Sequence, residues 1–294
     1  MLGVKVHLVD GTYELFRQNF GRLAKEPNAG PFAATTGVLA STLMLLADGA
    51  THLGVASDHI IESFRNDLWP GYKSSVGMPP ELLQQIPLME EALAAMGVTV
   101  WAMVTHEADD ALAAAAATAD GDERVEQVLI ITPDKDLGQC VRGRRVVQFD
   151  RRKRELIDED GVRAKFGVGP ASIPDYLGLV GDSADGFPGI AGWGAKSAAA
   201  VLARYGHLED IPAQPGQWDV PGLRGAAKLA ANLRDEYELA LLFRRIATAE
   251  TDVEVGRLDE WAWTGPTPEF EAWAVRLGEP RLAERAATLA ALRF

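Results

Sequence analysis

Residues 98–113 read VTVWAMVTHEADDALA and join an apolar run to an alanine-rich stretch through a cluster of acids. The run VTVWAMV is rich in β-branched and aromatic residues, which indicates a strand. The alanines that follow indicate a helix, because alanine has the highest intrinsic helix propensity. The first turn of a helix accommodates one or two negative charges. The group of Glu107, Asp109 and Asp110 therefore needs a further counter-charge.

The same alternation of strand and helix extends to both sides of this stretch. Strands are expected at 4–9, 51–57, 98–104 and 127–132, and helices near 37–47, near 81–96 and in the alanine-rich stretch. Such an alternation is typical of a mostly parallel sheet with helices on both faces. The predicted fold class is therefore α/β.

Acidic residues follow each of the four predicted strands. Ligand sites in open α/β sheets form beyond the carboxyl ends of the strands, so these side chains are expected to converge. At any single position a turn or a helix N-cap is the favoured interpretation, because aspartate is common in both. Taken together, the four strands favour a shared site, formed by Asp10, by Asp58, by Glu107 with Asp109 and Asp110, and by Asp134 with Asp136.

The composition is that of an ordinary globular chain of 294 residues, long enough for one large domain and a smaller one. Cys140 is the single cysteine, which excludes an internal disulfide and favours a cytoplasmic location. The apolar runs are too short to span a bilayer, and the N-terminus lacks the apolar core of a secretory signal. We therefore expect no membrane role and no export.

The formal net charge of −13 argues against a nucleic-acid partner, because nonspecific binding depends on Lys and Arg. The charge is unevenly distributed, however. Residues 142–154 (RGRRVVQFDRRKR) hold seven basic residues and one acid. A solvated hairpin with its turn near Asp150 and a patch that faces phosphates are equally good interpretations of this run.

The segment 59–80, HIIESFRNDLWPGYKSSVGMPP, interrupts the alternation. It interleaves aromatic residues with cations, a combination that suits unpaired bases and phosphates. Packing in a core explains Phe64 and Trp69 equally well. Tyr72 and Lys73 are expected to be more exposed.

Glycine and proline cluster after about residue 160, where we predict a second, mainly helical region. Residues 189–197, GIAGWGAKS, do not form a P-loop, because Ala195 separates Gly194 from Lys196. They predict instead a glycine-rich hairpin that opens a helix at about Ala195. The free N–H groups of that helix, together with Lys196, would hold one phosphodiester group without reading sequence.

Asp182 and Asp185 precede this hairpin and bring the number of candidate acids to nine. Carboxylates roughly 4 Å apart repel by about 4 kcal/mol at an effective dielectric constant of about 20, so the group needs cations. Oxygen ligands without histidine or cysteine favour Mg²⁺ or Mn²⁺ over zinc. Two such ions are commonly used for phosphodiester hydrolysis, and no serine or cysteine lies in a recognisable nucleophile motif.

Five motifs, in this order and at these intervals, resemble those of the bacterial and phage 5′-nuclease family, which includes flap endonucleases and the 5′-exonuclease domains of DNA polymerase I. They are LVDGTYELFR, SDHIIESFRNDLWPGYK, HEADDALA, TPDKDLGQ and GDSADGFPGIAGWGAKSA. The similarity covers about residues 4–250. It implies a structure-specific 5′ nuclease that cuts DNA near single-strand/duplex junctions and leaves 5′-phosphate and 3′-hydroxyl ends.

The resemblance also implies the organisation of the chain. A PIN-like nuclease domain is expected at 1–165, with a helical arch around 60–85. A helical region of the helix-hairpin-helix type, which binds duplex DNA, and a C-terminal packing segment are expected at 166–294. Because no polymerase region follows Phe294, a stand-alone enzyme is expected.

Residue roles follow from the same resemblance. The first metal cluster would consist of Asp10, Asp58, Glu107, Asp109 and Asp110, and the second of Asp134, Asp136, Asp182 and Asp185. The catalytic set would consist of Asp10, Asp109, Asp134, Arg65 and Lys73, the last of which would contact the scissile phosphate. DNA would be bound by Arg17, Tyr72, Lys73, Gly189, Gly192, Gly194 and Lys196.

The implied cofactors are two or three Mg²⁺ or Mn²⁺ ions, with a K⁺ ion at the glycine hairpin as a further option. The implied partners of this monomer are DNA with 5′ flaps, 5′ ends, gaps or nicks, including RNA-primed DNA, and replication proteins. One alternative is a nuclease-dead DNA-binding protein, against which the presence of all nine acids argues. The other is a small-molecule metallophosphatase or an RNA-directed metal nuclease, against which the glycine hairpin argues.

Three residues depart from the family pattern. Val76 stands where an arginine usually follows the arch lysine, a change that bears on substrate threading or on rate. Gly138 and Cys140 replace bulkier residues, and only a change of packing is expected there.

Overall fold

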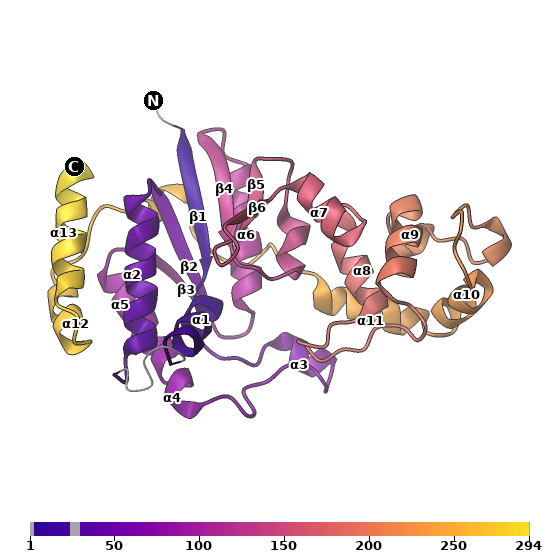
Figure 1. The fold of residues 1–294 in the computed structure, drawn as a ribbon, viewed down its shortest axis with the longest axis horizontal. Helices are drawn as coiled ribbons and strands as arrows, with labels where there is room; N and C mark the ends of the chain where they lie inside the picture. Colours follow the sequence, from indigo (N-terminus) through magenta and orange to yellow (C-terminus); the bar gives the residue numbers. More distant parts are fainter. Residues whose placement is uncertain (1–2, 24–29, 294) are drawn as a thin grey trace. The chain divides into compact units, whose positions relative to one another are not determined.

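The computed structural model describes residues 3–23 and 30–293 (Figure 1). The chain forms two compact units. The sheet unit contains residues 1–61, 75–132 and 250–294, and the helical unit contains residues 62–74 and 133–249. The units are interleaved along the chain, which passes between them more than once. They are a division by contacts, and the expected domain boundary at residue 165 stays a prediction.

Four parallel strands form the centre of the sheet unit. They are β1 (Val4–Asp10), β2 (His52–Asp58), β3 (Thr99–Met103) and β4 (Val125–Ile131), in the order β3-β2-β1-β4. Residues 53–57 of β2 are buried without interruption, as expected for a parallel strand that is covered on both faces. The prediction of a mostly parallel sheet is confirmed.

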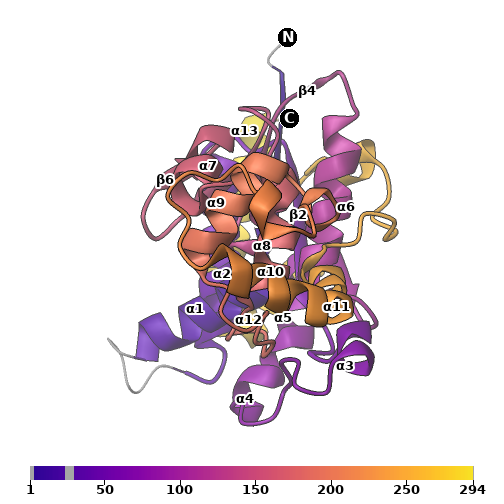
Figure 2. The same ribbon diagram turned by 90° about the vertical axis from the view of Figure 1, so that its right-hand side faces the viewer.

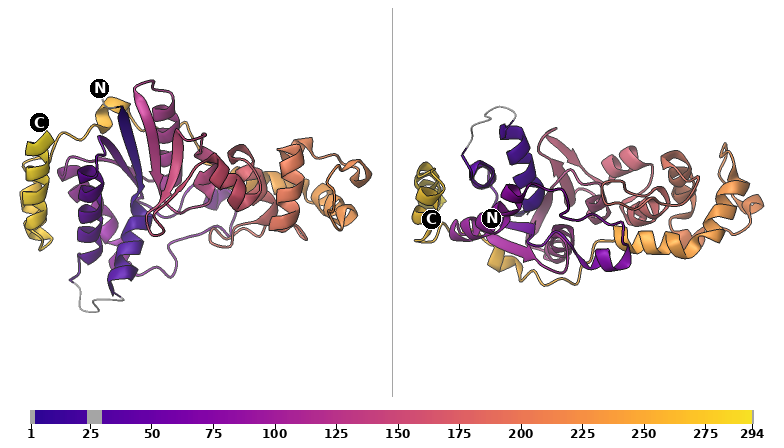
Figure 3. Two further views of the ribbon diagram at one scale, coloured as in Figure 1. Left: turned by 45° about the horizontal axis from the view of Figure 1, so that its top comes forward. Right: turned by 90° about the horizontal axis from the view of Figure 1, so that it is seen from below.

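Helices cover both faces of these strands (Figure 1). Packed on one face are α2 (Ala33–Ala47) and α5 (Gln85–Ala95), with α12 (Phe270–Arg276) and α13 (Arg281–Arg293) against them. Figure 3 shows α13, in yellow, beside α2. The other face carries α6 (Ala108–Asp120), whose small buried alanines let it contact all four strands. This is the helix predicted from the alanine-rich stretch.

The first helix, α1 (Gly11–Leu23), contacts β2 and α2. The helix expected near 81–96 is divided into α4 (Pro80–Leu83) and α5. Pro87 explains the division, because its ring nitrogen has no N–H with which to continue the hydrogen bonds of the first helix. None of the helices formed by residues 3–23 and 30–293 is long and apolar enough to cross a membrane.

The helical unit is built around α8 (Ile173–Val180), which contacts α9 (Ala195–Tyr205) and α11 (Tyr237–Ala247). Figure 2 shows these helices together with α10 (Ala226–Asp235). The unit also contains α3 (Phe64–Leu68) and α7 (Glu159–Phe166). Six short 3₁₀ or β elements complete it: η1 (Asp136–Cys140), η2 (Pro170–Ser172), η3 (Leu208–Asp210), η4 (Pro215–Gln217), β5 (Val146–Asp150) and β6 (Glu155–Ile157). Its core includes Leu177, Phe187, Val201 and Phe243.

The basic run of residues 142–154 forms a hairpin, as one of its two interpretations predicted. Strands β5 (Val146–Asp150) and β6 (Glu155–Ile157) pair antiparallel. Asp150 shapes the turn, because its Oδ1 accepts the N–H groups of Arg152 and Lys153 at 2.9 and 3.1 Å.

Candidate functional site

The carboxyl ends of the parallel strands carry the first group of predicted acids. Asp10 and Asp58 are the last residues of β1 and β2. Glu107 precedes the first residue of α6, and the backbone N–H of Ala108 donates to Asp58 Oδ1 at 2.8 Å. In the sheet, β2 lies on one side of β1 and β4 lies on the other, so the direction in which strands are added reverses at β1. Crevices for ligands form at such a reversal point in open α/β sheets.

Hydrogen bonds to the backbone and to a hydroxyl group fix Asp10. Its Oδ1 accepts the backbone N–H of Tyr13 at 2.8 Å, and its Oδ2 accepts the hydroxyl of Thr132 at 3.0 Å. These bonds join the end of β1 to the first turn of α1 and to the residue that follows β4. Sequence reasoning missed Thr132, although it is the first residue of the TPDKD motif.

The acids of the HEADD stretch are stabilised in part by the protein backbone. Asp110 is fully buried, and its Oδ2 accepts the N–H of Glu107 at 2.9 Å while its Oδ1 accepts the N–H of Glu250 at 2.8 Å. Asp110 thereby closes the start of α6. Each carboxylate oxygen has a second lone pair, so these bonds leave room for a metal ion.

The predicted acids of the second group, Asp134, Asp136, Asp182 and Asp185, lie close together in the helical unit. Asp136, Asp182 and Asp185 each offer an oxygen, and these oxygens lie within 4.8 Å of one another. Asp134 is adjacent, because its Oδ1 accepts the N–H of Asp136 at 3.0 Å. Asp182 Oδ1 accepts the N–H of Ala184 at 2.9 Å, which fixes the turn between the two aspartates of GDSAD.

The surroundings of Asp136 indicate whether this group of carboxylates suits a divalent cation. Its Oδ1 is buried and has no hydrogen-bond partner among the residues that the structure describes. Burial, and then the charges of Asp134, Asp185 and Asp182, raise its pKa well above the usual range. A hard divalent cation would satisfy the buried oxygen and remove the repulsion, so the residues fit such an ion.

Two lysines contact the second group. Lys135 Nζ forms an ion pair with Asp182 Oδ2, and Lys73 Nζ lies 3.1 Å from Asp185 Oδ1. Burial alone would lower the pKa of Lys135, but the hydrogen bond and charge of Asp182 outweigh burial and raise it. Lys135 was not predicted, although its position between Asp134 and Asp136 could have indicated it.

The segment that carries Lys73 is hydrogen-bonded to the turn of the second group. Trp69 Nε1 donates to the carbonyl of Gly186 at 3.0 Å, and the N–H of Lys73 donates to the carbonyl of Asp185 at 3.0 Å. The expectation that Tyr72 is exposed is wrong: only 6% of it is accessible, because its ring lies in the core of the helical unit.

Arg65 and Arg17 are both engaged by other groups of the protein. Arg65 is buried, and its guanidinium donates to the carbonyls of Ile246 at 2.8 Å and Thr248 at 3.0 Å, at the end of α11. Arg17 donates to Glu14 at 2.6 and 3.1 Å. These contacts give both arginines a structural role, and their predicted roles at DNA or phosphate stay predictions.

The glycine-rich hairpin leads into α9, which begins at Ala195 as predicted. Gly189 is buried with a φ of 71°, and a Cβ there would lie 2.4 Å from the nitrogen of Gly181. Gly192, Gly194 and Lys196 are exposed at the start of the helix. The arrangement leaves a helix N-terminus and one ammonium group facing solvent, which suits a phosphate.

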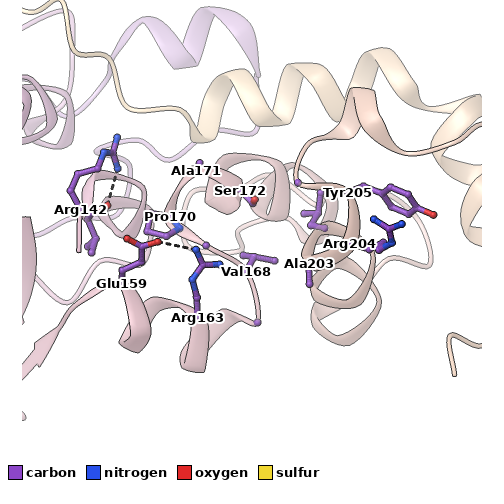
Figure 4. A pocket seen from close by; sticks show the side chains of 15 residues that line it. Arg142, Glu159, Arg163, Val168, Pro170, Ala171, Ser172, Ala203, Arg204 and Tyr205 are labelled. Carbon is purple, nitrogen blue, oxygen red and sulfur yellow. Dashed lines mark hydrogen bonds and ion pairs between the residues drawn. The ribbon is translucent and has the colours of Figure 1, made fainter. Parts of the chain in front are cut away.

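A hollow of about 670 Å³ elsewhere in the helical unit contains none of the predicted site residues. Figure 4 shows Arg142, Glu159 and Arg163 along one part of it and Tyr205 along another. Arg163 donates to Glu159 at 2.8 Å, and Arg142 donates to two backbone carbonyls. Its charged groups are therefore engaged within the chain and are separate from the acidic group.

Comparison with protein families finds two matches that together cover most of the chain. Residues 5–167 match the N-terminal resolvase-like domain of 5′-3′ exonucleases, and residues 168–269 match their C-terminal SAM fold. DNA polymerase I of Bacillus caldotenax is 32% identical over 276 residues, which are 90% of this chain and 30% of that protein. The 5′-3′ exonuclease of Buchnera aphidicola is 32% identical over 251 residues, 84% of this chain and 82% of that protein.

Solved structures share the fold. The T5 5′-exonuclease with bound zinc has a TM-score of 0.67 at 19% identity, covering 97% of this chain and 98% of that one. The T5 flap endonuclease in a pseudo-enzyme-product complex with DNA and metal ions has a TM-score of 0.64 at 20% identity, covering 97% of each chain. The chain spans about a third or less of the DNA polymerases I that it matches.

Proposed function

Because the chain belongs to the 5′-3′ exonuclease family, we propose that it is a structure-specific 5′ nuclease that hydrolyses DNA near single-strand/duplex junctions. It would act on 5′ ends and on 5′ flaps. The observation that carries this proposal is the cluster of three carboxylates, Asp136, Asp182 and Asp185, on a family scaffold. Its crowding is costly unless a cation is bound.

Two groups of carboxylates would hold Mg²⁺ or Mn²⁺. The first group is Asp10, Asp58, Glu107, Asp109 and Asp110, and the second is Asp134, Asp136, Asp182 and Asp185. Bound divalent ions stabilise the negative charge that develops on the attacking and leaving oxygens of a phosphodiester. A T5 5′-exonuclease structure contains zinc and another T5 structure contains metal ions, which supports metal use in this fold.

The chain's own cations and backbone would bind and orient the DNA. Lys73, next to Asp185, would place its ammonium group at the scissile phosphate, where positive charge stabilises the transition state. The N-terminus of α9 and Lys196 would hold a phosphate of the duplex without reading sequence. Tyr72 could stack on a base only after its ring leaves the core, so we expect its main role to be support of Lys73.

The substrate and setting are further parts of the proposal. Flaps, gaps and nicks in DNA, including RNA-primed DNA, and a cytoplasmic location in replication and repair fit relatives named DNA polymerase I and 5′-3′ exonuclease. The T5 complex with DNA supports a nucleic-acid substrate in preference to a small molecule. The second candidate is a nuclease-dead DNA-binding protein, which would bind DNA through the same cations and backbone groups.

A cleavage assay separates these candidates. A 5′-labelled flap substrate and an uninterrupted closed circle would each be incubated with Mg²⁺, Mn²⁺ or a chelator. We expect cutting of the flap with either ion and no cutting of the circle or in chelator. Binding of the flap without cutting under every condition would favour the nuclease-dead alternative.

Asp134→Asn tests the second carboxylate group. Asparagine keeps the Oδ1 that accepts the N–H of Asp136 but loses the negative charge, so the fold should be retained. We expect cleavage to fall by about 10² or more while DNA binding survives. The exposed Asp252→Asn is the control for loss of one charge and should cleave normally. Full activity of Asp134→Asn would remove this residue from the site.

A further inference from the structure

Lys135 lies inside the second carboxylate group, between Asp134 and Asp136 in the chain. Its ammonium group pairs with Asp182 Oδ2. The Asp182 side chain is only 4% exposed, whereas the Lys135 side chain is 35% exposed. The carboxylate is therefore fixed in place, but the lysine has open solvent beside it.

A divalent ion at this group would compete with Lys135 for the carboxylate of Asp182. Asp182 Oδ1 accepts the N–H of Ala184, and Oδ2 pairs with Lys135. Asp136 and Asp185 place their oxygens within 4.8 Å of one from Asp182. A divalent cation among these oxygens would lie close to the ammonium group of Lys135, and the two like charges would repel.

We propose that Lys135 is an internal cation that neutralises the second carboxylate group in the metal-free protein and is displaced from Asp182 when a divalent ion binds. The residue thereby sets the ion affinity of this group. The inference rests on the proposed metal-dependent function and adds a competing residue to it.

Lys73 also contacts the group but is held differently. Its backbone N–H donates to the carbonyl of Asp185, which ties its main chain to the turn. The Lys135 backbone lies at the start of η1, where its carbonyl accepts the N–H of Gly138 at 3.1 Å, and its long, flexible side chain can move into solvent. The side chain of Lys135 is also the more exposed of the two, 35% against 28% for Lys73, so it is the cation that an incoming ion displaces more easily.

The test measures ion binding and does not use cleavage. The full chain is stripped of metal with chelator and titrated with MnCl₂ by calorimetry, in an Asp109→Asn background that weakens the first group. Lys135→Met removes the charge and keeps the length of the side chain, Lys135→Arg keeps the charge, and Lys228→Met is a control lysine exposed on α10. Thermal unfolding of each variant is recorded with chelator and with MnCl₂.

We expect Lys135→Met to bind Mn²⁺ about tenfold more tightly, because one repulsive charge is gone. Lys135→Arg and Lys228→Met should stay within about threefold of the parent. In chelator, Lys135→Met should unfold at a lower temperature, and it should gain more from Mn²⁺ than the parent does. A Met variant that folds only with Mn²⁺ supports the proposal for the same reason.

Unchanged or weaker Mn²⁺ binding by Lys135→Met would overturn the proposal. Failure of this variant to fold even with saturating Mn²⁺ would also overturn it, because the ion could then not replace the lysine. The outcome of this binding test does not depend on whether the chain cleaves DNA. A parent chain that binds Mn²⁺ but cuts no DNA would refute the proposed function and leave this test valid.

Discussion

Two buried aspartates show how differently a carboxylate can be accommodated in this protein. Asp110 has a backbone N–H for each oxygen. Asp136 Oδ1 is buried without a hydrogen-bond partner among the described residues, and three other aspartates surround it. An unsatisfied buried acceptor costs about 1–3 kcal/mol, so Asp136 lowers the stability of the metal-free protein.

We predict that Asp136→Asn stabilises the metal-free protein. The amide removes a buried charge and can donate to the oxygens of Asp182 or Asp185, which lie within 4.8 Å. A gain of about 1 kcal/mol in unfolding free energy corresponds to about 2–4 °C in a chain of this size. Thermal unfolding in chelator measures it, with Asp252→Asn as the control for net charge.

The gain in unfolding free energy of Asp136→Asn should depend on pH. The pKa of Asp136 is raised, so the folded chain binds its proton more tightly than the unfolded chain does. The metal-free parent therefore loses stability as the pH rises from the ordinary aspartate pKa of about 4 toward the raised value. The difference between Asp136→Asn and the parent should be small near pH 4 and should grow with pH. A constant difference would contradict this explanation.

The places of two acids could be predicted from the sequence, because a residue at the end of a strand is placed by local pattern alone. Asp10 and Asp58 needed only the positions of their strands. The surroundings of Tyr72 and Arg65 could not be predicted in this way. Tyr72 is buried, and Arg65 bonds residues more than 180 positions away, by packing that no local pattern encodes.

At the scale of elements, the turn at 181–187 and the segment at 69–73 meet at two glycines. Gly186 has a φ of 82°, and a Cβ there would lie 2.0 Å from the carbonyl oxygen of Gly71. The hydrogen bonds of Trp69 and Lys73 to this turn depend on that approach. The position of Lys73 is therefore determined by the absence of a side chain at residue 186.

We predict that Gly186→Ala destabilises the protein and slows cleavage. The left-handed backbone costs about 1–2 kcal/mol for any other residue, and the overlap with Gly71 adds about 1–3 kcal/mol. Gly206→Ala is the matched control, because its φ is 83° and nothing lies within 4 Å of the added Cβ. Denaturant unfolding and single-turnover cleavage of both variants check the result.

Gly206→Ala should show the cost of the backbone alone and should cleave at the parental rate. Equal losses in the two variants would mean that the close approach of the two segments has no energetic weight. Equal cleavage rates would mean that Lys73 does not depend on the turn.

The elements themselves were largely predictable. The four parallel strands and the start of α9 follow from apolar runs and from the glycines before Ala195. The break between α4 and α5 was missed, although Pro87 was visible, because a proline near a helix start can also be tolerated. Sequence pattern places elements well and their interruptions less well.

At the scale of the whole molecule, the net negative charge comes from one unit. The helical unit has 19 Lys and Arg against 18 Asp and Glu, a formal charge of +1. The sheet unit has 10 against 24, a formal charge of −14. Net charge therefore says little about which part of the chain can meet a polyanion.

We predict that Lys196→Ala weakens duplex binding at every sequence and lowers the slope of log affinity against log salt by about 1, because one phosphate contact is lost. Arg257→Ala, on the sheet unit, removes the same charge and should leave the slope unchanged. Fluorescence anisotropy across a salt series measures both. An identical slope for Lys196→Ala and the parent would remove the glycine hairpin from the interface.

The division into units was the least predictable feature. Composition changes near residue 160 suggested one boundary, but segment 62–74 packs with residues 133–249, and segment 250–294 packs with the sheet. The placement of these two segments depends on contacts such as those of Trp69 with Phe243 and of α13 with α2. Contacts between segments so far apart in sequence leave no local trace in composition.

This interleaving has a consequence for how the chain is made. A ribosome adds roughly 5–20 residues per second, so segment 62–74 emerges on the order of 10–40 s before residue 249, which completes its unit. During that interval Trp69 and Tyr72 have no finished core to enter. The nascent chain therefore exposes aromatic side chains until late in translation, and a holdase chaperone that recognises such side chains would find its target there.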